Sequence, residues 1–165
     1  MKTVSIINMA GVLAIAVFLF LNKTSEKRIV YVNNNVLLTG FKMSAELNSN
    51  VKNIEQSRQM VLDSILNELK LLKNANNLAD AEKLKSTYLA KRNMFTEELT
   101  KVKQSMSDKI AAQINQYVKD FSEEKKYDIV LGANGSGNIW YSTENNDITK
   151  DLVAYVNKKY DDRKN

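Results

Sequence analysis

No proline occurs in this chain of 165 residues, and no glycine lies between Gly40 and Gly132. A globular α/β domain would need turn residues many times over such a stretch, because reversals of the chain favour glycine, proline and small polar side chains. A long helix needs none of them. The sequence therefore predicts that the region between these two glycines is helical and that strands are confined to the flanking segments.

Apolar residues recur through this region mainly at intervals of three and four, as in helices that bury one stripe. The first series is Leu47, Val51, Ile54, Val61, Ile65, Leu69 and Leu72, interrupted by Arg58. The second is Leu84, Tyr88, Phe95, Leu99, Val102, Met106, Ile110, Ile114, Tyr117 and Phe121. The two series predict two long helices that share one apolar seam.

The sequence Asn-Ala-Asn-Asn at 74–77 separates the two series. Asparagine caps helices and tolerates left-handed backbone, so we predict that the chain reverses near residues 74–77. The helical hairpin then occupies residues 41–126, with arms of about 50 and 70 Å at 1.5 Å per residue. A single helix that continues through Asn76 is the alternative, at a cost in helix propensity.

Strand-like segments flank the hairpin on both sides. β-branched and aromatic side chains are dense at 28–32 and at 127–131. Glycines separate the second segment from residues 139–142, and this order predicts a β-hairpin. A last helix is expected from Lys150 to about Tyr160, capped by Asp147 or Thr149. The fold class is therefore mainly α with a small β base, which comprises residues 26–40 and 127–165.

Residues 1–25 have the pattern of a targeting segment, because Lys2 precedes an apolar run at 9–21. No small-residue cleavage pattern follows this run. A helix over residues 3–21 would be about 28 Å long, close to the ~30 Å core of a bilayer. A signal peptide that is removed and an uncleaved signal anchor therefore both stay open, and removal would leave a soluble protein.

Composition argues against catalysis. The chain has no histidine and no cysteine, which removes the usual general base, the thiol nucleophile and the commonest ligands of zinc. We expect no enzyme, no metal site and no cofactor, and no nucleic-acid partner. The net charge of +5 suits an acidic partner or an anionic surface.

The order of these segments resembles the Skp/OmpH family of periplasmic chaperones for outer-membrane proteins. The likeness is carried by Arg28-Ile29-Val30-Tyr31-Val32, by Tyr127-Asp128-Ile129-Val130-Leu131, and by Asp147-Ile148-Thr149 with Leu152. The resemblance implies a periplasmic homotrimer in which strands of the subunits form a body and the hairpins surround an unfolded client. Export of the chain is favoured for the same reason.

An oligomeric body also follows from size, because so few short strands bury little apolar surface alone and leave open edges. The residues expected in this body are Ile29, Val30, Tyr31, Val32, Ile129, Val130, Leu131, Ile139 and Trp140. They are the apolar and aromatic side chains of the three strand-like segments.

Client contact is expected from apolar residues that remain once the seam is filled. The candidates are Leu62, Leu66, Met94, Phe95 and Met106, and methionine adapts to varied partners. Residues 70–92 form a basic arm end with a net charge of +4, carried by Lys70, Lys73, Lys83, Lys85, Lys91 and Arg92. This end is expected to attract acidic clients, anionic lipid or lipopolysaccharide, or to act only as a solubilising face.

Two functions of different classes are consistent with the sequence. The first is an ATP-independent holdase that keeps unfolded outer-membrane proteins from aggregating through many weak contacts. The second is a membrane-anchored coiled-coil scaffold or tether of the cell envelope that binds no unfolded client. An uncleaved N-terminal segment would favour the scaffold.

Overall fold

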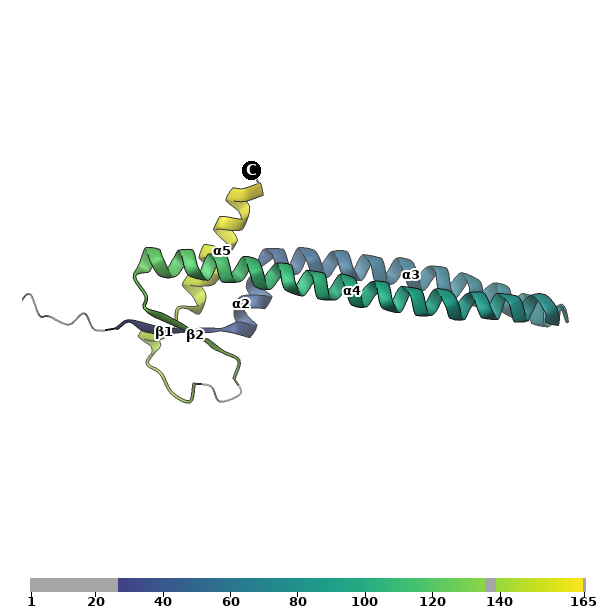
Figure 1. The fold of residues 1–165 in the computed structure, drawn as a ribbon, viewed down its shortest axis with the longest axis horizontal. Helices are drawn as coiled ribbons and strands as arrows, with labels where there is room; N and C mark the ends of the chain where they lie inside the picture. Colours follow the sequence, from purple (N-terminus) through teal and green to yellow (C-terminus); the bar gives the residue numbers. More distant parts are fainter. Residues whose placement is uncertain (1–26, 136–138, 165) are drawn as a thin grey trace, which may run out of the picture.

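The computed structural model describes residues 27–135 and 139–164, so the expected targeting segment lies outside the described residues. Two long antiparallel helices project from a small base, as Figure 1 shows. The elements are β1 (Ile29–Asn33), α2 (Asn34–Gly40), α3 (Lys42–Asn74), α4 (Leu78–Lys125), β2 (Ile129–Ala133), a 3₁₀ turn η1 (Glu144–Asn146) and α5 (Thr149–Lys164). The predicted fold class is confirmed.

The hairpin reverses at the asparagine cluster. Asn76 adopts a left-handed conformation with φ of 57°, and the amide of Asn77 donates to the carbonyl of Leu72 over 3.0 Å. This is a Schellman-type end in which asparagine takes the place of glycine. The side chain of Asn77 then accepts from the amide of Asp80 and caps α4. At 1.5 Å per residue, α3 with 33 residues is about 50 Å long and α4 with 48 residues about 72 Å.

The sheet of the base joins the two ends of the hairpin. β1 and β2 run parallel, with Ile29 opposite Ile129 and Asn33 opposite Ala133. On its other edge β1 forms a single parallel bridge between Tyr31 and Asp147. Parallel strands need a long crossover, and here the whole hairpin is that crossover.

The predicted β-hairpin over residues 127–142 is wrong in its second half. Residues 139–142 are irregular in the part that the structure describes, and Trp140 is 93% exposed. β2 pairs with β1 instead, because the returning α4 delivers the chain next to the first strand. Strand propensity does not indicate which segment a strand pairs with. The side chains of Trp140 and Tyr141 stay exposed in the described chain.

A short helix, α2, was not predicted. The side chain of Asn33 accepts hydrogen bonds from the amides of Asn35 and Val36, so the asparagine run that ends β1 also starts a helix. Leu37 is the buried residue of this helix. Gly40 ends it beneath α5, where a Cβ atom would lie 3.0 Å from a methyl of Val153.

The core lies where the arm meets the base. It contains Val30, Val32, Leu37, Phe41, Ile110, Tyr117, Phe121, Ile148, Leu152 and Val156. Phe41 is fully buried between α2 and α3, and its ring packs edge-on against Tyr117 and Tyr160, with centroids 6.2 and 5.6 Å away. The arm is therefore fixed to the base by aromatic packing of Phe41 against α4 and α5.

We expect Phe41→Ala to lower the free energy of unfolding by about 3–5 kcal/mol, because it removes a large side chain that its neighbours cannot replace. Urea unfolding followed by circular dichroism measures the loss. Leu89→Ala, at an exposed position of α4 in the distal arm, is the matched control and should change stability by less than about 0.5 kcal/mol. Equal losses in the two variants would contradict the assignment of Phe41 as the joint.

Candidate functional site

The seam between the arms follows a regular heptad in its distal part. On α3 the positions that face α4 alternate in steps of four and three: Val51, Glu55, Arg58, Leu62, Ile65, Leu69 and Leu72. On α4 the matching positions are Ala81, Leu84, Tyr88, Lys91, Phe95, Glu98 and Val102. All are buried or half-buried. The seam covers one mainly apolar stripe on each helix, as a two-helix coiled coil requires.

This seam corrects part of the predicted client-contact set. Leu62 and Phe95 are buried between the helices, so they hold the hairpin together. Leu66 is half-buried, and Met106 packs against the core cluster. Only Met94 of the five is well exposed, at 53%. Sequence periodicity gives the apolar stripe but not how far each helix is rotated toward its neighbour, and that rotation decides which residues stay free.

A group of exposed apolar residues, of which the sequence predicted only Met94 as a client contact, lies on the distal half of the arm. Its members are Met60, Val61, Leu71, Leu78, Leu89 and Met94, and we call it the distal apolar group. Met60 and Leu71 are 67% and 68% exposed. They are eleven residues apart, close to three helical turns, so they lie on one face of α3. Within the described residues, no other part of α3 or α4 has a large apolar side chain this exposed.

Basic residues surround this group. Lys83 and Lys85 make ion pairs with Asp80 and Glu82 on their own helix, at 3.8 and 3.1 Å. Such exposed pairs contribute little to stability. Lys91 lies over the ring of Phe95, with 6.0 Å between the ammonium nitrogen and the centroid. Lys70, Lys73 and Arg92 are also exposed on this half. The distal half thus combines apolar side chains with a net positive charge.

Arg58, which interrupts the apolar series, crosses the seam and binds Glu98. The guanidinium donates from Nε and one terminal nitrogen to the two carboxylate oxygens, at 2.9 and 2.6 Å. It also lies over the ring of Phe95, 5.0 Å from the centroid. The hydrogen bond from Arg58 lowers the pKa of Glu98 below its ordinary value. A second pair, Lys103 with Glu55 at 2.6 Å, crosses the seam nearby. These two ion pairs fix the register of the arms.

The base has a second set of exposed apolar residues, which we call the base apolar group: Ile29, Val36, Leu38, Ile129, Leu131, Trp140 and Tyr141. Four of the residues predicted for the oligomeric body belong to it. Val30 and Val32 do not, because they are buried in the core of their own chain, and Tyr31, Val130 and Ile139 are half-buried. The alternation along β1 explains the difference, since successive side chains point to opposite faces.

The described residues contain no group of three or more histidine, cysteine, aspartate or glutamate side chains that could hold a metal ion. Among them there is also no helix long and apolar enough to cross a bilayer.

The model of the OmpH-like outer membrane protein family matches residues 28–156. The chain belongs to the OmpH-like family. The match contains both strands, the whole hairpin and the buried half of α5. Family membership supports a chaperone-type role.

A solved structure has the same fold. It is the crystal structure of an OmpH-like candidate outer membrane chaperone from Caulobacter crescentus CB15, with a TM-score of 0.54 and 15% sequence identity. The alignment covers 82% of this chain and 86% of that one. A search of curated proteins found no match. At this identity the likeness concerns the fold alone, so function has to be argued from the surfaces of this OmpH-like chain.

We expect the link between Arg58 and Glu98 to be sensitive to acid. Because the folded pKa of Glu98 is lowered, the pair contributes stability above the ordinary carboxylate pKa near 4.5, and this contribution is lost as the pH falls through the folded value. In Glu98→Gln this part of the acid dependence should be missing. Thermal unfolding at a series of pH values measures it.

Arg58→Met retains much of the contact with Phe95 without the charge, and it should lose the same acid-dependent part. Glu97→Gln, one residue away and without an ion pair in the described chain, is the control and should keep the dependence of the wild type. If all three variants follow the wild-type curve, Arg58 and Glu98 do not couple the arms.

Proposed function

We propose that this OmpH-like chain is an ATP-independent periplasmic holdase that binds unfolded outer-membrane proteins and prevents their aggregation. The observation that carries the proposal is the position of the distal apolar group. It lies on the half of the arm farthest from the base, where Figure 1 shows only the two helices. Met60 and Leu71 lie on one face of α3 with their apolar side chains exposed, so this half of the arm offers contact to an apolar partner.

The distal apolar group is better suited to weak binding of many client segments than to tight recognition of one. The apolar side chains are separated along the arm and lie in no single pocket, so each would contact a client weakly. Several weak contacts from one arm give a useful affinity through effective concentration, while each contact can still break quickly. Met60 and Met94 are unbranched and adapt to varied side chains. No covalent step is involved, and the chain has neither histidine nor cysteine to perform one.

The functional unit is proposed to be a homotrimer whose subunits meet through the base apolar group. β2 has β1 on one side only, and its other edge is open in the described chain. Ile129 and Leu131 of this strand are exposed, and so are Trp140 and Tyr141 in the loop that follows. Open strand edges with exposed apolar side chains pair with other chains unless they are covered. Anionic lipid or lipopolysaccharide is a further proposed contact of the basic arm end.

The rival proposal is a scaffold or tether of the cell envelope that binds no unfolded protein. Its support is the apolar run at 9–21, which would anchor the chain if it is retained. The mass of the protein recovered from its own cell decides whether the segment is removed. A denatured β-barrel protein diluted into buffer with this protein decides the function: a holdase keeps the barrel protein soluble, and a scaffold leaves its aggregation unchanged.

The distal apolar group should carry the holdase activity. We expect the triple variant Met60→Ser, Leu71→Ser and Leu78→Ser to bind the denatured client at least about tenfold more weakly, because each lost apolar contact costs a sizeable part of the 1.5–3 kcal/mol available for full burial. Light scattering of the aggregating client and fluorescence titration measure the effect. Exposed polar residues of the proximal arm, changed together as Ser49→Ala, Ser107→Ala and Asn115→Ala, form the control. Equal activity of both variants would place client binding elsewhere.

The base apolar group should carry assembly. We expect Ile129→Thr with Leu131→Thr to shift the protein from trimer toward smaller species, because threonine keeps the strand propensity and removes apolar contact area. Light scattering after size-exclusion chromatography measures the mass. The arm variant Met60→Thr with Leu71→Thr should remain trimeric. A wild-type protein that is a monomer at all concentrations would refute the trimer.

A further inference from the structure

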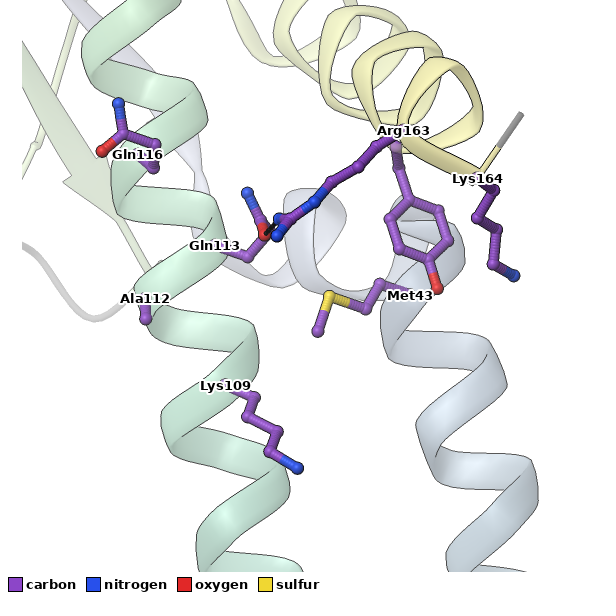
Figure 2. Close-up of a pocket in the computed structure, with 8 residues that line it drawn as sticks. Met43, Lys109, Ala112, Gln113, Gln116, Arg163 and Lys164 are labelled. Carbon is purple, nitrogen blue, oxygen red and sulfur yellow. Dashed lines mark hydrogen bonds between the residues drawn. The ribbon is translucent and has the colours of Figure 1, made fainter.

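Two adjoining pockets lie on the proximal half of the arm, far from the distal apolar group. One, of about 600 Å³, is at the junction of α3, α4 and α5 and is lined by Met43, Gln113, Tyr160 and Arg163, as Figure 2 shows. The other, of about 340 Å³, lies between α3 and α4 and is lined by Leu47, Val51, Val102 and Met106. Lys109 lines both. We call the two pockets together the proximal groove.

The spacing of apolar residues on α4 explains why the seam opens here. Beyond Glu98 the half-buried and buried positions Val102, Met106 and Ile110 follow in steps of four, without the three-residue steps of the distal part. Each four-residue step rotates the stripe by about 40° around the helix. The stripe therefore leaves α3 and turns into the core, where Ile110 and Tyr117 join the cluster that contains Leu152 of α5. Small side chains, such as Ser105, line the gap that remains.

The groove has an apolar end and a cationic end. Leu47, Val51, Val102 and Met106 form the apolar end. At the other end Arg163 reaches from α5 to α4 and donates to the side-chain oxygen of Gln113 over 2.6 Å, so it meets an amide and not a carboxylate (Figure 2). Lys109 points toward the space between α4 and α3 in the same view.

The cations of the groove are only partly neutralised by the protein itself. Neither Lys109 nor Arg163 has an ion pair within the described residues, and Lys101, which lines the smaller pocket, has none either. Two carboxylates lie close by. Glu46 is occupied by Lys164 at 2.6 Å and by Tyr160, and Asp108 accepts from Gln104. The groove thus keeps free positive charge beside an apolar floor.

We infer that the proximal groove binds a segment of an unfolded polypeptide in which a carboxylate lies next to apolar side chains. The apolar side chains occupy the space over Val51 and Met106, and the carboxylate takes a place between Lys109 and Arg163. The inference rests on the proposed holdase function and adds a selective site to it. The distal apolar group has no matching pocket and accepts apolar segments of any charge, whereas the groove discriminates by charge, as complementary surfaces do.

Two short fluorescent peptides with the same apolar residues test this, one with glutamates and one with glutamines at the polar positions. Fluorescence anisotropy with the protein in the form that its own cell makes measures the affinity. We expect the glutamate peptide to bind at least about tenfold more tightly, and the double variant Lys109→Glu with Arg163→Glu to abolish that advantage through charge repulsion. The matched control Lys52→Glu with Lys158→Glu makes the same change of net charge at exposed positions outside the groove and should retain it.

Three results would overturn the inference. They are equal binding of the two peptides, equal loss of the preference in the groove and control variants, and displacement of the glutamate peptide by laurate at matching concentration, which would assign the groove to a free amphiphile. If the double variant does not fold, Lys109→Gln with Arg163→Gln takes its place and should also reduce the preference. A photoreactive side chain at Ala112, which lines the groove, should label the glutamate peptide, and one at Ala154, exposed on α5 outside the groove, should not.

The peptide assay also separates this inference from the holdase proposal. Protection of a denatured β-barrel protein, with no preference between the peptides, would reject the groove and leave the holdase function standing. Failure to protect the barrel protein would reject the holdase, whatever the peptides do.

Discussion

Two packed helices can bury only one stripe of each, and the surfaces of this molecule follow from that limit. In the distal arm the seam takes every apolar residue at the heptad positions, so any further apolar side chain must face water. Met60 and Leu71 are in this position on α3, and Leu78 is at the start of α4. These exposed side chains are the apolar surface of the distal arm that remains after the seam is filled.

The same limit makes the base necessary. A hairpin of this length has little core of its own, and its two ends would fray without a common anchor. The anchor is built from residues far apart in sequence. The amide of Arg28 donates to the carboxylate of Asp128 at 2.7 Å where the two parallel strands begin. α5 then ties down the start of α3, because Lys164 and Tyr160 both bind Glu46 and lower its pKa. Packing around Phe41 and these polar links hold the arm at a fixed angle to the sheet.

Much of the fold could be predicted from the sequence, because it depends on local signals. The missing glycines and prolines, the two apolar series and the asparagines at 74–77 each act within a few turns of helix. What could not be predicted depends on contacts between distant segments. The parallel pairing of β1 with β2 was missed because the sequence of a strand does not indicate which strand it pairs with. Burial of Leu62 and Phe95 was missed because helix rotation is set across the seam. The role of Arg58 depends on Glu98, which lies opposite it across the seam.

The change of spacing on α4 links the arm to the base and to the groove. Steps of three and four keep a stripe on one line, and steps of four alone turn it around the helix. α4 uses the first pattern as far as Val102 and steps of four from there to Ile114, so its apolar stripe faces α3 in the distal arm and α5 at the base. The groove lies where the stripe changes partner. If the stripe did not turn, α5 would lose the apolar surface of Ile110, Tyr117 and Phe121 on which it packs. The shift in spacing thus anchors the arm, and the groove lies at the point where the stripe turns.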